Sequence, residues 1–151
     1  MRFLFALLVA LGVPALASAS PAPSVSATED GVAIGGYDPV AYFTEGHPVA
    51  GSPAFILRWN GATWRFTSAA SRARFEATPE AYAPAFGGYC AWAISQNYIA
   101  PGDPQVWRIV DGRLYLNFNR RAQALWETDL TGSIARGHAN WPRVLETADN
   151  R

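Results

Sequence analysis

The sequence predicts an α+β domain in which a small antiparallel sheet, built from two β-hairpins, is flanked by short helices. Each predicted hairpin has a two-residue turn of a favoured tight type, Asn60-Gly61 in the first and Asp111-Gly112 in the second. Helix-start signals follow both hairpins. A chain of 151 residues, half of them hydrophobic, is long enough for one domain with a core and too short for two of comfortable size.

Residues 1–19 have the layout of a secretory signal peptide. Arg2 is followed by an apolar run, and Ala17-Ser18-Ala19 offers a cleavage site. The run is shorter than the roughly 20 apolar residues that a spanning helix needs. We therefore expect a periplasmic or secreted protein without stable membrane insertion after cleavage. Residues 20–30, rich in Ser, Pro and Ala, predict a flexible leader, and residues 31–147 predict the domain.

The charge balance bears on possible partners. The twelve basic residues are all arginine and are matched by twelve acidic residues. Surfaces that bind nucleic acid or anionic membranes need a basic excess, which this chain lacks. We therefore expect no nucleic-acid partner, and the sequence points to no particular protein partner.

The first half of the domain is predicted to contain a short strand and then the first hairpin. Residues 40–43 suggest the strand, after a turn signal at 35–39. The hairpin joins two alternating runs, 55–59 and 62–66. Its two-residue turn predicts the facing pairs Trp59 with Ala62, Leu57 with Trp64, and Phe55 with Phe66. These six residues then share one face, which we expect to face the core.

Short helices are predicted between the hairpins. Thr67 or Ser68 can cap a helix over 69–77, and Thr78-Pro79-Glu80 has the composition of a second helix start. A bend at Gly87-Gly88 follows, and then an apolar segment around Cys90. That segment is too short for its periodicity to distinguish a helix from a strand.

The second hairpin is predicted around Asp111-Gly112, with Ile109 facing Leu114 and Trp107 facing Leu116. Asn119 is a plausible cap for a helix that carries Leu125 and Trp126. Beyond it, two short helical turns are expected to pack the apolar residues of the tail, which are Ile134, Trp141, Val144 and Leu145.

Several segments resemble a known family, the YHS domain. The matching residues are Asp38-Pro39-Val40, Trp64-Arg65-Phe66-Thr67-Ser68, Arg72-Ala73-Arg74-Phe75 and Pro79-Glu80-Ala81-Tyr82. Residues 35–43 and 87–91 resemble more closely the longer, exported branch of that family, and the similarity extends from about Gly31 to Leu145. The resemblance implies one YHS-like scaffold for nearly the whole mature chain.

The resemblance does not extend to metal chemistry. Short YHS modules beside copper-transporting ATPases have a cysteine after the Asp-Pro-Val element and a Cys-x-x-x-Cys at the helix start, and such thiolates suit soft metal ions. In this chain Ala41, Thr67 and Ser71 occupy those positions. Neutral hydroxyls are poorly matched to Cu(I), so the metal chemistry of those relatives is not carried over to these residues.

Cys90 is the only cysteine, so the chain cannot form an intrachain disulfide. One interpretation is a small buried side chain beside Trp92, since free cysteine is among the most buried residue types. The other is a functional thiol in the first turn of a helix, where the dipole favours the thiolate.

We predict a binding module whose pocket for a metal ion or small ligand is lined by four residues, Tyr89, Cys90, Trp92 and Ser95. Cys90 would be the soft donor, and copper or zinc the metal, provided that another donor such as His47, His138 or an oxygen atom lies nearby. Two alternatives stay open. One is a thiol-dependent enzyme that uses Cys90, although no motif assigns catalytic residues. The other is a structural or protein-interaction domain without a small ligand.

Overall fold

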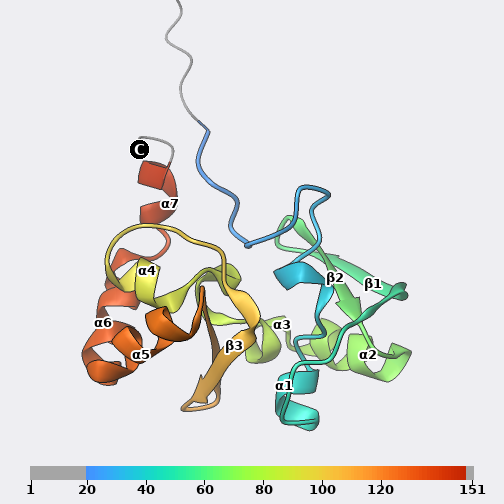
Figure 1. Cartoon of the computed structure of the whole chain (residues 1–151). Helices are drawn as coiled ribbons and strands as arrows, with labels where there is room; N and C mark the ends of the chain where they lie inside the picture. Colours follow the sequence, from blue (N-terminus) through green and yellow to red (C-terminus); the bar gives the residue numbers. More distant parts are fainter. Residues whose placement is uncertain (1–19, 149–151) are drawn as a thin grey trace, which may run out of the picture.

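The computed structural model describes residues 20–148, and the predicted signal peptide at 1–19 lies outside them. These residues form two halves, each built on one hairpin (Figure 1). The elements of the first half are η1 (Ile34–Gly36), α1 (Ala41–Thr44), β1 (Ser52–Trp59), β2 (Ala62–Phe66), α2 (Ala69–Ala77) and α3 (Pro79–Tyr82). Those that follow are η2 (Ala85–Gly88), α4 (Ala91–Ser95), β3 (Asp103–Val110), β4 (Arg113–Asn117), α5 (Arg120–Thr128), α6 (Leu130–Asn140) and α7 (Val144–Thr147). The α+β class is confirmed.

The hairpins form two separate two-stranded antiparallel sheets rather than one small sheet. Most of the predicted register is confirmed: Trp59 pairs with Ala62, Leu57 with Trp64, Ile109 with Leu114 and Trp107 with Leu116. The predicted pair of Phe55 with Phe66 is wrong, because the register shifts between Ser52 and Ile56 and Phe66 pairs with Ser52. Such an irregularity far from the turn is not encoded by the turn residues.

Two of the predicted helix caps are confirmed, whereas Thr78, before α3, makes no side-chain cap hydrogen bond. Ser68 Oγ accepts a hydrogen bond from the Ser71 backbone N–H at 3.1 Å and so caps α2. Asn119 Oδ1 accepts from the Ala122 N–H at 2.8 Å and caps α5. Both are short polar side chains that satisfy a free N–H of the first turn.

The strand predicted over 40–43 is wrong, since this segment begins the short helix α1. Asp38 Oδ1 accepts from the Val40 N–H at 2.9 Å, and this side-chain contact bends the backbone at Pro39 into a turn. The short apolar run is buried in either conformation, so its hydropathy could not distinguish a helix from a strand.

The segment for which we expect a flexible leader, 20–30, lies against the domain (Figure 1). Val25 and Ser26 are buried, and the Ser26 N–H donates to the Gly87 carbonyl at 2.9 Å. The Ala22 N–H donates to the Leu145 carbonyl at 3.0 Å, which joins the segment to the end of the domain. The packed part of the chain therefore includes residues before the expected boundary at Gly31.

Two hydrophobic clusters stabilise the two halves. The first surrounds Trp64 and Phe75, whose rings lie 5.1 Å apart, under the β1–β2 hairpin. The second surrounds Trp126 and Tyr115, 5.2 Å apart, between β4 and α5. The β3–β4 hairpin contributes to both clusters: Leu114 and Leu116 belong to the first, and Tyr115 belongs to the second. Between residues 20 and 148, no helix has the length and apolar character needed to cross a membrane.

Candidate functional site

Cys90 lies at the start of α4, directly after a tight bend. Phe86, Gly87 and Gly88 have φ values of 57°, 61° and 83°, so three consecutive residues adopt the left-handed region. The Cys90 N–H then donates to the Ala100 carbonyl at 2.8 Å, and Cys90 forms the N-cap position of α4. The predicted bend into a helix beside Cys90 is therefore present, and the short apolar segment is helical.

The thiol of Cys90 is buried, with 1 % of the residue exposed. Burial raises the pKa of the thiol above its ordinary value, although backbone groups of Ala93, Phe118 and Trp92 act in the opposite direction. Its Sγ donates to Asn117 Oδ1 at 3.6 Å, and the Trp92 N–H donates to the same oxygen at 3.0 Å. These contacts describe a neutral thiol rather than an activated thiolate.

A pocket of about 190 Å³ opens beside the thiol, and we call it the Cys90 pocket. It is lined by residues from three parts of the chain, which are Cys90, Trp92, Tyr98, Ala100, Phe118, Asn119, Arg121, Ala122 and Leu125. Its walls thus come from α4, the loop before β3, the end of β4 and the start of α5. The side chains that line it are aromatic or aliphatic, apart from one thiol, one amide and one guanidinium.

The four residues predicted to share a pocket do not converge. Cys90 and Trp92 line the Cys90 pocket, but Tyr89 lines a separate groove of about 800 Å³ beside residues 23–31. The Tyr89 hydroxyl donates to the Pro23 carbonyl at 2.9 Å, which ties it to the N-terminal segment. The larger groove does not include Cys90 among its lining residues, so it is not a site for the thiol.

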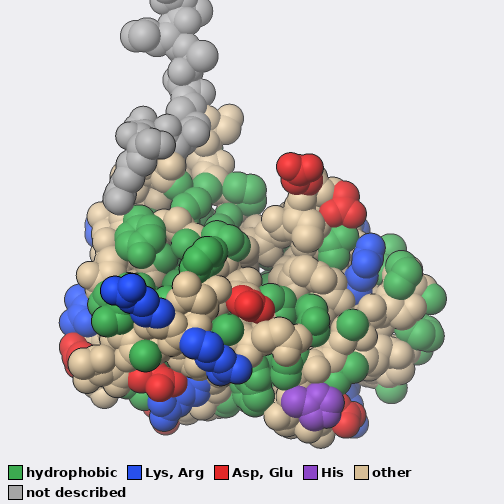
Figure 2. Space-filling view, viewed as in Figure 1, with side chains coloured by type: hydrophobic (Ala, Val, Ile, Leu, Met, Phe, Trp, Pro, Cys, Tyr) green, Lys and Arg blue, Asp and Glu red, His purple; other side chains and the backbone are tan. Residues whose placement is uncertain are grey.

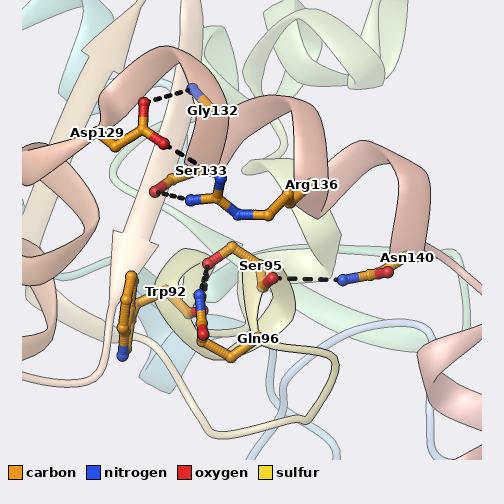
Figure 3. A network of polar contacts seen from close by, with 8 residues as sticks. All are labelled: Trp92, Ser95, Gln96, Asp129, Gly132, Ser133, Arg136 and Asn140. Atoms are coloured by element: carbon orange, nitrogen blue, oxygen red, sulfur yellow. Dashed lines mark hydrogen bonds and ion pairs between the residues drawn. The ribbon is translucent and has the colours of Figure 1, made fainter.

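Ser95 belongs to a structural network on the other side of α4. Its hydroxyl donates to the Trp92 carbonyl at 2.7 Å and accepts from Gln96 Nε2 at 3.1 Å. Asn140 Nδ2 of α6 donates to the Ile94 carbonyl at 2.9 Å, which attaches α6 to this end of α4. Figure 3 shows Ser95 within these contacts, while the Trp92 indole points away from it. The network positions α4 and leaves Ser95 outside the pocket.

The described residues offer no ready metal site. Between residues 20 and 148, no group of three or more His, Cys, Asp or Glu side chains lies together as metal ligands would. His47 is exposed, with Nδ1 3.2 Å from the Pro48 carbonyl. His138 packs against Phe86, with Nε2 3.5 Å from the Tyr115 hydroxyl. Both histidines thus contact other groups, and the polar side-chain partner of the thiol is Asn117.

A second polar cluster, around Asp38, joins residues of two segments that resemble the YHS domain, 38–40 and 64–68, and also includes Ser71. The carboxylate is fully buried, and Oδ2 accepts from the Thr67 N–H and Thr67 hydroxyl, both at 2.9 Å. The Ser71 hydroxyl donates to the same oxygen at 2.6 Å. The Thr67 and Ser71 hydroxyls thus bind a carboxylate, and the cluster fastens the turn before α1 to the start of α2. We interpret it as structural because each carboxylate oxygen already has protein donors.

Sequence reasoning missed most of the pocket. Tyr98, Phe118, Arg121 and Leu125 carry no motif and are as much as 35 residues from Cys90 along the chain. The one usable signal was the placement of Phe118 and Leu125, large hydrophobic residues beside polar ones near a predicted helix cap.

The burial of Cys90 predicts slow thiol chemistry. We expect a disulfide reagent such as DTNB to label the native protein at pH 8 at least about tenfold more slowly than a free cysteine peptide, because both access and thiolate fraction are reduced. Labelling after denaturation in guanidinium should be fast and complete. Rapid labelling of the native protein would contradict the buried, neutral thiol.

Comparison with known proteins yields no relative: a scan against protein-family models, a search of curated proteins and a search of solved structures each found no match to this chain.

Proposed function

We propose that this chain is an exported, YHS-like binding module that holds a small organic ligand in the Cys90 pocket. One observation carries the proposal. Of the four large hydrophobic side chains that are exposed between residues 20 and 148, three line this single pocket. Tyr98, Phe118 and Leu125 are 37 %, 51 % and 42 % exposed, whereas the fourth, Ile56, lies on β1.

A cluster of exposed apolar side chains around a concavity is typical of a binding site. Isolated exposed hydrophobic residues are common on protein surfaces and need no explanation. Three that surround one pocket leave apolar area in water that a ligand would cover, at about 25 cal/mol for each Å² removed from water. Concave sites with mostly apolar walls and a few polar groups are also the usual form of small-molecule sites.

An organic ligand fits this pocket better than a metal ion. A metal would require the thiolate, whose formation is disfavoured by the raised pKa of Cys90. It would also require further donors, and besides the thiol the lining offers only the neutral oxygens of Tyr98 and of Asn119, the latter already capping α5. The same raised pKa argues against a nucleophilic role, since the thiolate is the attacking species.

The family and compartment are part of the proposal. The sequence resemblance to exported YHS-domain proteins supports them, together with the signal-peptide layout of residues 1–19. The cluster at Asp38 adds support, because it gives a common structural role to Asp38 and Thr67, which come from separate segments of the resemblance.

Titration with a small neutral aromatic, benzyl alcohol, tests the binding site by ¹H–¹⁵N NMR. We expect saturable shifts at the amides of Cys90, Phe118 and Ala122, with a dissociation constant on the order of millimolar for so small a probe. Ala122→Phe places a ring in the pocket and should weaken binding at least about tenfold. Its matched control is Ala124→Phe, at an exposed position of the same helix that does not line the pocket.

The Ala124→Phe control shows whether any loss of binding is specific to the pocket. Ala124→Phe should bind the probe as the unaltered protein does, and both variants should keep the dispersed NMR spectrum of a folded chain. Absence of saturable shifts at the pocket amides, or equal binding by Ala122→Phe and the unaltered protein, would overturn the proposed site.

A further inference from the structure

We propose that the ligand of the Cys90 pocket is a small organic anion, with an apolar body against the aromatic walls and an anionic group paired with Arg121. This inference rests on the proposed function and names the class of its ligand. It depends on three observations that are independent of the exposed hydrophobic residues. They are the charge of the lining, the lack of a partner for the Arg121 guanidinium between residues 20 and 148, and the size of the pocket.

The lining carries an uncompensated positive charge. Arg121 is the one charged residue among the residues that line the pocket, and no Asp or Glu is among them. Between residues 20 and 148, neither a hydrogen bond nor an ion pair involves its guanidinium. Its neighbour Arg120, in contrast, donates to Gln123 Oε1 at 3.3 Å and to the Gln105 carbonyl at 3.4 Å. Arg121 is therefore available to a ligand and Arg120 is engaged.

The position of Arg121 is unfavourable for the helix that carries it. Helix α5 begins at Arg120 and has no acidic residue in its first turn. The start of a helix carries a partial positive charge, so an arginine there is disfavoured by the dipole and an anion is favoured. A local departure from a stabilising rule is expected where function requires the residue. An anion bound at Arg121 would interact favourably with both the guanidinium and the partial positive charge at the start of α5.

Apolar side chains lie beside the Arg121 guanidinium in the lining of the pocket. Phe118 and Leu125 flank Arg121 in sequence and line the same pocket, so an apolar body and an anionic group could be held together. Hydrophobic and arginine side chains also lie next to one another on the α4–α6 side of the face drawn in Figure 2. A guanidinium presents several N–H donors in one plane, which suits a carboxylate.

The size of the pocket limits the ligand. A volume near 190 Å³ corresponds to about six water molecules at roughly 30 Å³ each, which suits a ligand of about six to ten non-hydrogen atoms. It lies below the range of about 300 to 1,000 Å³ that is usual for drug-sized ligands. Simple aromatic or branched aliphatic carboxylates have this size and charge.

The experiment compares benzoate with neutral benzyl alcohol by the same NMR titration. We expect benzoate to bind the unaltered protein about two- to fivefold more tightly, a difference typical of an accessible charge pair, and less so at high salt. Arg121→Gln should abolish this preference, so that the variant binds benzoate no more tightly than it binds benzyl alcohol. Arg120→Gln, the matched control, should keep the preference because Arg120 does not line the pocket.

The outcomes separate the two proposals. Equal binding of both probes at the pocket, or an anion preference that survives Arg121→Gln, would overturn the anionic class and leave the binding site standing. Failure of both probes to shift the pocket amides would overturn the proposed function itself. A benzoate preference lost in Arg121→Gln but kept in Arg120→Gln supports both.

Discussion

Asp38→Ala should destabilise the domain by about 3 kcal/mol or more, because it removes a buried carboxylate and leaves its hydrogen-bond donors without partners. The side chain is fully buried and accepts bonds from Val40, Thr67 and Ser71. The Ser71 hydroxyl and the Thr67 N–H come from the region after β2, so the substitution also separates α1 from the start of α2. Equilibrium unfolding in urea, followed by tryptophan fluorescence, measures the loss.

Asp103→Ala is the matched control for this prediction. Asp103 makes the same local turn, with Oδ1 accepting from the Gln105 N–H at 2.8 Å, but no other hydrogen bond of its carboxylate is recorded. We expect it to lose no more than about 1 kcal/mol, the net value of a single ordinary hydrogen bond. Equal losses in the two variants would show that the local turn, and not the buried cluster, is what stabilises the fold.

Gly88→Ala should have the second largest effect, about 2 to 5 kcal/mol of lost stability. Part of the loss is backbone strain, because Gly88 has a φ of +83°, where an alanine is disfavoured by about 1 to 2 kcal/mol. The remainder is overpacking, since an added Cβ would lie 2.6 Å from Ile34 Cγ2 and 3.2 Å from Pro84 Cγ. Ile34 is itself buried, so it has little room to move. The change would also disturb the bend that positions Cys90.

Gly112→Ala separates the strain from the clash. Gly112 has a similar φ of +74°, but nothing lies within 4 Å of a Cβ added there. It should therefore show the strain alone, and Gly88→Ala should lose about 1 to 3 kcal/mol more than this control. Thermal and urea unfolding of the two variants supply the comparison. Similar stabilities would mean that the region around Ile34 can relax and that the bend is not tightly packed.

Features set by short-range chemistry could be predicted from the sequence. Asn60-Gly61 and Asp111-Gly112 adopt positive φ values, as tight hairpin turns require, and the register next to each turn follows from them. Ser68 and Asn119 cap α2 and α5 because a short polar side chain before a helix reaches a free N–H within three residues. These interactions involve residues close in sequence, so the pattern is sufficient.

Features that depend on distant contacts could not be predicted. Residues 40–43 begin a helix beside the Asp38 carboxylate, which the distant residues Thr67 and Ser71 hold in place, and Phe55 loses its expected partner to a register shift. The segment 20–30 has the composition of a flexible leader, yet its backbone bonds to Gly87 and Leu145. Composition reports average tendencies, whereas these outcomes depend on which surface the fold makes available.

The amino-acid sequence by itself determined the α+β class, the two hairpins, the helix starts and the position of a single thiol at the bend between the halves. Only the tertiary structure decided that Tyr89 and Ser95 face elsewhere and that Arg121, Phe118 and Leu125 meet Cys90 instead. The physical reason is the distance along the sequence between the residues that interact. Turns and caps arise from contacts within a few residues, but a pocket is assembled from side chains that become neighbours only when the hydrophobic clusters have brought their elements together.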